Sequence, residues 1–160
     1  MKRRRLLSVL AGASAFSGCA TGYVADDVSP TYRYEAPIVY DRPDIELSLR
    51  DGPARLGGTV AFDITNTGES GVGLGCKNPW AFQHRVDGEW QHVTWTASRY
   101  PLLCLTSVAP GGTYTERVTF SEAWMAEQGL SLQRPLSAGT YRYVIVGTEP
   151  YPALEFELRE

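Results

Sequence analysis

From Asp44 onward, apolar and polar residues alternate in short runs separated by turn residues about every ten positions, a pattern typical of β-strands with one buried face. The clearest runs are 45–49 and 60–64, the second of which is followed by Asn66-Thr67-Gly68. The same pattern predicts further strands over 72–74, 81–86, 90–96, 103–108, 113–120, 139–146 and 154–158. Only 122–128 has helical character. Because it has a single turn and no apolar repeat, we expect a connector between strands.

Asp87-Gly88 is a favourable pair for a two-residue hairpin turn, because both positions of such a turn require a positive φ. A turn there predicts a register that pairs Val86 with Glu89, Arg85 with Trp90, His84 with Gln91, Gln83 with His92, Phe82 with Val93 and Trp80 with Trp95. The alternative, a three-residue loop, pairs the two histidines directly but mixes tryptophan and phenylalanine with threonines on one face. The two-residue turn gives the better packed face.

The sequence offers no clear set of residues for catalysis or metal binding. His84 and His92 are the only two histidines, and the predicted register points them to opposite faces, whereas zinc takes three or four converging ligands. There is no Gly-x-Ser-x-Gly nucleophile motif, and the glycines from Gly68 to Gly75 are not followed by the Lys-Ser/Thr of a phosphate-binding loop. We therefore expect a protein that is not an enzyme and has no cofactor and no metal.

The first nineteen residues have the layout of an export signal, with four basic residues, an apolar stretch over 6–16, and Ser17-Gly18 before Cys19. An apolar stretch of about eleven residues is too short for a transmembrane helix, which needs about 20. The order resembles the signal of prokaryotic lipoproteins, and Arg3-Arg4 resembles a twin-arginine signal, although Sec export stays open. The resemblance implies cleavage of 1–18 and a diacylglyceryl group on Cys19, whose two chains suffice for stable attachment of an extracytoplasmic, membrane-anchored lipoprotein.

Loss of 1–18 leaves 11 basic residues against 18 acidic ones, a net charge of about −7. Such a charge argues against nucleic acid as a partner, because lysine and arginine supply most of that affinity. Residues 19–43 contain Pro30 and Pro37 and lack a sustained repeat, so we expect a lipid-anchored tether before a domain over 44–160. Alternatively, the tyrosines of this segment pack along the domain as an extra edge segment.

Several short motifs follow one another in a particular order: Asn66-Thr67-Gly68, then Asp87-Gly88-Glu89-Trp90, then Pro110-Gly111, then Gly139-Thr140-Tyr141. Over about 45–146 this order resembles bacterial and archaeal immunoglobulin-like domains, including the family similar to the Bacillus intracellular proteinase inhibitor. The resemblance implies an all-β fold, an immunoglobulin-like antiparallel β-sandwich of about 7 to 9 strands with one short helical connector. Such families include adhesion, assembly and inhibitor modules, so the fold does not by itself specify the function.

We therefore predict a non-catalytic protein-binding or assembly module with an unknown protein partner. Exposed tryptophan and arginine are common binding hot spots. The candidate contact residues are Trp90, Arg85, Lys77, Asn78, Arg99 and Tyr100. The alternative for Arg85 is that its methylene stem only covers Trp90. Two other functions stay open: a peptidase inhibitor that presents the loop 98–103, and a glycan-binding module.

Cys76 and Cys104 are the cysteines that remain once Cys19 carries lipid, and export places them in an oxidising compartment. We predict a disulfide between them that closes a loop of about 28 residues and stabilises the fold by about 2 to 4 kcal/mol. The alternative is two buried thiols.

The disulfide can be tested by labelling the denatured protein with a thiol reagent and locating the label by mass spectrometry. Without reductant, neither Cys76 nor Cys104 should be labelled, whereas both should be labelled after reduction. Labelling of both cysteines without reductant would exclude the bridge.

Overall fold

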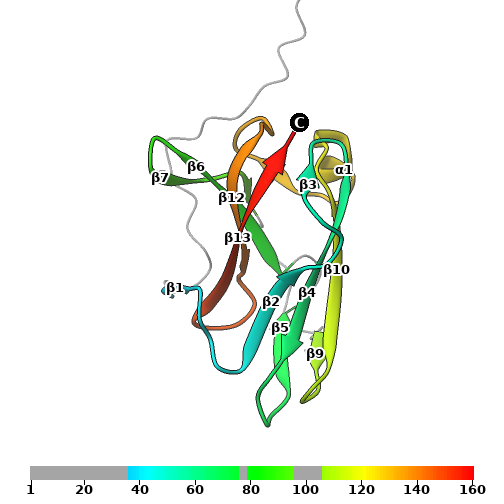
Figure 1. The fold of residues 1–160 in the computed structure, drawn as a ribbon, viewed down its shortest axis with the longest axis vertical. Helices are drawn as coiled ribbons and strands as arrows, with labels where there is room; N and C mark the ends of the chain where they lie inside the picture. The colour runs from blue at the N-terminus through cyan, green and yellow to red at the C-terminus, as the bar shows by residue number, and fades with distance from the viewer. Residues whose placement is uncertain (1–35, 76–78, 96–105) are drawn as a thin grey trace, which may run out of the picture.

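The computed structural model describes residues 36–75, 79–95 and 106–160, and it shows an all-β sandwich with one short helix (Figure 1). One layer is a six-stranded sheet. Its strand order is β1 (Ile38–Val39), β13 (Tyr151–Arg159), β12 (Gly139–Ile145), β6 (Trp80–Val86) and β7 (Glu89–His92), with β3 (Ala54–Arg55) also on β13. The long strands are antiparallel, whereas β1 and β3 run parallel to the two ends of β13.

The second layer is an antiparallel sheet of β10 (Thr113–Thr119), β4 (Thr59–Asn66) and β2 (Ile45–Leu49). Two short pairs complete the described fold: β5 (Val72–Gly75) with β9 (Thr106–Val108), and β8 (Thr94–Trp95) with β11 (Ser131–Leu132). The helix α1 (Glu122–Glu127) begins after Ser121, whose hydroxyl accepts from the Trp124 N–H. Among the described residues, no helix is long and apolar enough to cross a membrane.

The predicted all-β sandwich with one helical connector is therefore confirmed. The described residues contain 13 strands where about 7 to 9 were expected for such a sandwich. Most of the excess comes from two-residue strands such as β1 and β3, which are too short to show an alternating pattern.

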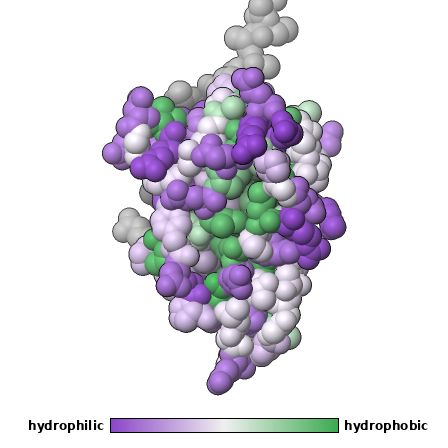
Figure 2. Space-filling model, in the orientation of Figure 1, coloured by the Kyte–Doolittle hydropathy of each residue, from purple (hydrophilic) through white to green (hydrophobic). Residues whose placement is uncertain are grey.

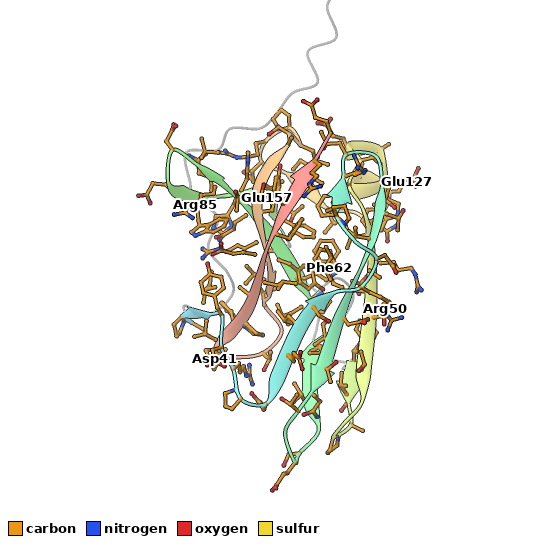
Figure 3. The ribbon with its side chains drawn as sticks, viewed as in Figure 1. Asp41, Arg50, Phe62, Arg85, Glu127 and Glu157 are labelled. Atoms are coloured by element: carbon orange, nitrogen blue, oxygen red, sulfur yellow. The ribbon has the colours of Figure 1, made fainter. Side chains whose placement is uncertain are left out.

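An aromatic cluster fills the space between the two sheets. Phe62 of β4 stacks on Tyr143 of β12, with ring centroids 4.2 Å apart and an interplanar angle of 15°. Phe62 lies between the layers in Figure 3. The ring centroids of Phe82 and Phe156, from the six-stranded sheet, lie 5.8 Å and 5.4 Å from that of Phe62. All four rings are buried, and such offset or edge contacts add to the free energy gained by burying apolar area.

The hairpin of β6 and β7 has the predicted register. Asp87 and Gly88 have φ values of 52° and 86°, as this turn requires, and the four pairs from Val86–Glu89 to Gln83–His92 are formed. The predicted pair of Trp80 with Trp95 is wrong, because β8 pairs with β11. The chain leaves β6 at Val93, where the Thr94 hydroxyl accepts from the Phe82 N–H at 2.8 Å and replaces the next ladder bond.

Residues 36–43, placed in the tether by the sequence, lie against the six-stranded sheet. β1 pairs with Tyr151 and Pro152, and Ile38 packs against a second apolar cluster on the outer face of this sheet, formed by Val144, Tyr151 and Ala153. β1 is thus a short edge strand of this sheet. Residues 19–35 lie outside the described ranges.

Arg42 attaches this N-terminal segment to the loop between β12 and β13. Its guanidinium pairs with Asp44 at 2.7 Å and donates to the Thr148 hydroxyl at 3.0 Å and to the Pro150 carbonyl at 2.8 Å. The side chain is 11% exposed, so these bonds form with little competition from water.

Gly147, just beyond β12, touches the backbone of β5. A Cβ atom at this position would lie 1.6 Å from the Leu74 carbonyl oxygen, so a side chain cannot be accommodated there without moving one of the two segments. The close approach holds β5 against the end of the six-stranded sheet.

We expect Arg42→Ala to lower the free energy of unfolding by about 1 to 3 kcal/mol, because it leaves the partly buried Pro150 carbonyl and the Asp44 carboxylate without their partner. The matched control is Arg50→Ala, which removes an ion pair with Asp63 from a side chain that is 48% exposed. That change should cost about 1 kcal/mol at most. Urea unfolding measures both values, and equal losses would contradict the anchoring role of Arg42.

Candidate functional site

Strand alternation carries three side chains with binding potential to the outer face of the six-stranded sheet. Tyr141 and Tyr143 of β12 point into the core, so Arg142 between them points outward. Arg85 of β6 and Trp90 of β7 are a directly opposed pair, and Arg142 is opposite Gln83 on the next strand. Figure 3 shows Arg85 on the β6–β7 hairpin, away from Phe62 and the core.

Trp90 is the centre of this group, which we call the Trp90 cluster: Trp90, Arg85, Arg142, Gln83 and Tyr40. The Cζ atom of Arg142 lies 4.5 Å from the centroid of the half-buried indole ring, and that of Arg85 lies 5.8 Å away. Both distances fall in the range of attractive cation–π contacts. Arg85 does cover Trp90, as the alternative supposed, but Arg142 comes closer to the ring.

Arg142 is held in position by polar contacts on both sides. Its Nε donates to the Gln83 side-chain oxygen at 2.7 Å, one terminal nitrogen contacts the same oxygen, and the other donates to the Tyr40 hydroxyl at 3.0 Å. Gln83 is 4% exposed, whereas Tyr40 is 54% exposed. The guanidinium is therefore fixed from the buried side, and the exposed phenol closes the cluster at the surface.

Arg85 and Arg142 carry the charge of the Trp90 cluster, and the exposed Glu155 of β13 is directly opposite Arg142 on the same face. Within the described ranges neither Arg85 nor Arg142 forms a salt bridge. His92 lies beside Gln83, with both ring nitrogens 3.5 Å from the amide nitrogen. Burial and then the nearby Arg142 charge lower the pKa of His92, so its ring stays neutral at neutral pH. The two arginines thus supply the charge of the cluster.

The histidines lie on opposite faces of β6 and β7, as predicted. His84 stacks on Tyr141, with ring centroids 4.5 Å apart and an interplanar angle of 12°. No group of three or more His, Cys, Asp or Glu side chains converges for a metal in the part of the chain that the structure describes.

A second polar group lies inside the sandwich. Glu116 shares the inward face of β10 with Val118, and it accepts a hydrogen bond from the Tyr114 hydroxyl at 3.0 Å. Burial raises the pKa of Glu116, while the Tyr114 hydroxyl and the nearby Trp80 indole N–H act in the opposite direction. The indole N–H and the Tyr143 hydroxyl are buried without a hydrogen-bond partner in the described ranges.

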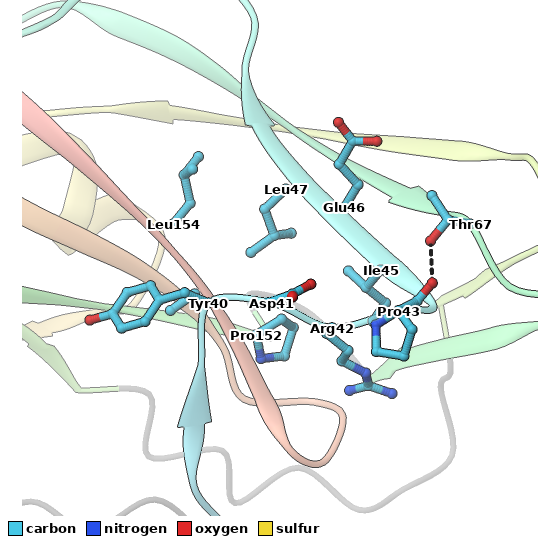
Figure 4. Close-up of a pocket in the computed structure, with 11 residues that line it drawn as sticks. Tyr40, Asp41, Arg42, Pro43, Ile45, Glu46, Leu47, Thr67, Pro152 and Leu154 are labelled. Atoms are coloured by element: carbon cyan, nitrogen blue, oxygen red, sulfur yellow. Dashed lines mark hydrogen bonds between the residues drawn. The ribbon is translucent and has the colours of Figure 1, made fainter.

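A cavity of about 340 Å³ opens between β2 and β13 at the edge of the sandwich (Figure 4). We call it the edge groove. Its walls come from the segment that joins β1 to β2, from β2 itself, from the residue after β4 and from the start of β13. They comprise Tyr40, Asp41, Arg42, Pro43, Ile45, Glu46, Leu47, Thr67, Pro152, Ala153 and Leu154.

Of the residues predicted from the sequence, the structure brings Trp90 and Arg85 together. Cys19, Cys76, Cys104, Lys77, Asn78, Arg99, Tyr100 and the loop 98–103 lie outside the described residues. Sequence reasoning missed Arg142, Gln83 and Tyr40. The alternation of Tyr141, Arg142 and Tyr143 indicates that the arginine faces outward, but only the order of strands places it beside Trp90.

Glu116→Gln should change the pH dependence of stability. A carboxyl with a raised pKa binds more protons in the folded than in the unfolded state, so stability falls as the pH rises from the ordinary pKa of 4.5 through the raised value. The neutral amide avoids this loss. The variant should therefore melt above the wild type at neutral pH and converge with it near pH 4.

Thermal melts across this pH range test the expectation, with the exposed Glu69→Gln as the matched control. If the melting temperatures of the wild type and Glu116→Gln change in parallel with pH, the pKa of Glu116 is not raised in the folded protein.

Comparisons with known proteins identify no relative by sequence: no family model matches, and no curated protein matches. Similar solved structures include the Pseudomonas fluorescens alkylpurine DNA glycosylase AlkC bound to DNA containing an abasic site analog, with a TM-score of 0.35 and 14% identity over 73% of this chain and 31% of that one. Another is the Listeria innocua β-glucosidase in complex with gluconolactone, with a TM-score of 0.37 and 14% identity over 72% of this chain and 16% of that one. This chain thus spans less than a third of either protein, and the likeness assigns it neither a family nor an activity.

Proposed function

We propose that the protein is a membrane-anchored extracytoplasmic lipoprotein that binds a protein partner through the Trp90 cluster and catalyses no reaction. The observation that carries the proposal is a half-buried tryptophan with two guanidinium groups over its ring, on the solvent-facing side of a sheet. Tryptophan and arginine are the residues most enriched among interface hot spots.

The rigidity of the cluster supports binding rather than only packing. Arg142 is oriented by Gln83 and Tyr40 before any partner arrives, so docking on it costs little further side-chain entropy. Trp90 and Arg85 lie on paired strands whose register is set by a tight turn. A partner therefore meets a surface that is already in its binding arrangement.

The charge of the cluster indicates the chemistry of the partner surface. Two arginines without a salt bridge in the described ranges favour a partner that offers carboxylates or other acidic groups around an apolar contact for Trp90. The overall acidic charge of the mature chain does not oppose this, because exposed charges more than about 10 Å apart are screened from one another in salt solution.

The position of Tyr40 relates the cluster to the proposed anchor. Tyr40 follows β1 directly and bonds Arg142 through its hydroxyl, so the chain segment that arrives from the lipid-bearing end contributes to the cluster itself. In this arrangement the partner would bind next to the point where the tether joins the domain.

The proposal can be tested by cross-linking in intact cells, followed by affinity capture and mass spectrometry. The wild type should recover one stoichiometric partner. Trp90→Ala should recover at least about tenfold less of it, because truncating a hot-spot residue costs more than about 1.4 kcal/mol of binding free energy. Arg117→Ala is the matched control, since Arg117 is exposed on the other sheet and should leave capture unchanged.

The outcomes separate the functions that the sequence leaves open. A thermal melt of Trp90→Ala close to that of the wild type, together with lost capture, supports a binding surface, whereas equal loss of both would make Trp90 a packing residue. Recovery of a peptidase with Trp90→Ala as efficiently as with wild type would favour the inhibitor alternative. A Cys19→Ala form tests whether capture depends on the anchor.

A further inference from the structure

Polar groups lie mostly at the surface of the sandwich, where Figure 2 shows hydrophilic residues around a hydrophobic middle. Two polar atoms of the core are exceptions. The indole N–H of Trp80 on β6 and the hydroxyl of Tyr143 on β12 have no hydrogen-bond partner in the described ranges. Both side chains are 0% exposed, so bulk water does not reach them, and native proteins seldom leave such groups unsatisfied.

The two groups belong to neighbouring rings that face the same carboxyl. The ring centroids of Trp80 and Tyr143 lie 6.1 Å apart, and Tyr143 stacks on Phe62 at 4.2 Å. Glu116 of β10 is directly opposite Phe62 in the pairing with β4, so the register places the carboxyl beside these rings. Burial and then the charge of Glu116 raise the pKa of Tyr143, in agreement with this placement.

The carboxyl of Glu116 has acceptor capacity that Tyr114 does not use. The Tyr114 hydroxyl donates to one carboxyl oxygen at 3.0 Å. An ionised carboxyl accepts about four hydrogen bonds through its two oxygens, so a further donor can be accommodated. Two donors without an acceptor therefore lie next to an acceptor that is only partly used.

The kinds of group around this point select the ligand. Trp80 can only donate, so a metal cation would meet its indole proton, and an anion would meet the carboxyl of Glu116. A water molecule can accept from the two donors and donate to the carboxyl at the same time, and it serves either protonation state of Glu116. A larger polar ligand would need the space that the packed rings occupy.

We propose that the sandwich contains an internal binding site for one water molecule between Trp80, Tyr143 and Glu116. The water accepts from the indole N–H and from the Tyr143 hydroxyl and donates to a carboxyl oxygen of Glu116. A buried water typically makes about three such bonds. It links β6 and β12 of one sheet to β10 of the other through the apolar interior.

The site lies on the inner face of the six-stranded sheet, whereas the Trp90 cluster lies on the outer face. The proposal therefore does not depend on the proposed function.

Tyr143→Phe is a test in which the presence and the absence of the water predict different results. If the hydroxyl binds water, its removal deprives that water of a partner and should raise the unfolding equilibrium constant by about fivefold in urea unfolding. If the hydroxyl has no partner, its removal relieves a buried unsatisfied group, and the variant should be as stable as the wild type or more stable.

Tyr141→Phe is the matched control, because Tyr141 is also buried and its hydroxyl donates to the Ser137 carbonyl at 2.8 Å. Its loss should raise the unfolding equilibrium constant by a similar factor, with or without an internal water.

A crystal structure of the wild-type protein, at a resolution that shows ordered waters, tests the site without any variant. We expect a water within about 3.2 Å of the Trp80 Nε1 atom, the Tyr143 hydroxyl oxygen and a carboxyl oxygen of Glu116. The same site in Tyr143→Phe should hold a water with two protein partners or lose it.

The proposal is overturned if the wild-type crystal structure shows no water in reach of both donors, or if the Trp80 indole N–H bonds Glu116 directly. It is also overturned if Tyr143→Phe is at least as stable as the wild type while Tyr141→Phe is destabilised. An anomalous signal from rubidium or bromide at this position in soaked crystals would show that an ion, not water, is the ligand.

Discussion

The stacking of Phe62 on Tyr143 is the contact on which the rest of the arrangement depends. It joins the central strands of the two sheets and sets which residues of β12 face the core. Because side chains alternate along a strand, burying Tyr141 and Tyr143 forces Arg142 to the outer face, where β6 and β7 bring Trp90 over it. The surface cluster is thus a consequence of how the core is packed.

The sequence predicts the features that depend on neighbours along the chain. Alternation locates the long strands, and Asp87-Gly88 predicts the hairpin register because both residues can adopt positive φ. It cannot predict β1 and β3, since a two-residue strand has no period and its partner lies over a hundred residues away. The sequence also predicts the pair of Trp90 and Arg85, because these residues are adjacent across a hairpin. It does not predict Arg142 or Tyr40, because they reach Trp90 from strands that are distant along the chain.

The net charge of the chain does not indicate the local charge of its surfaces. Residues 19–160 contain seven more acidic than basic residues, yet the Trp90 cluster contains two arginines and no acidic residue, and the edge groove is lined by Asp41 and Glu46. Tyr40 lies between the two sites, so the segment that enters the domain separates surfaces of opposite sign. Glu116 adds a carboxyl inside the sandwich, where its burial costs stability and where no described cation compensates it.

Gly147 limits which sequences can adopt this fold. Every other amino acid carries a Cβ, and at this position that atom would overlap the Leu74 carbonyl. Small side chains are therefore excluded at position 147 as firmly as large ones. In a library containing all substitutions and selected for folded protein, position 147 should stay invariant, while Glu149 two residues later, exposed to solvent, accepts most replacements. A single invariant glycine next to a variable loop would then mark the junction between β5 and the six-stranded sheet in any set of functional variants.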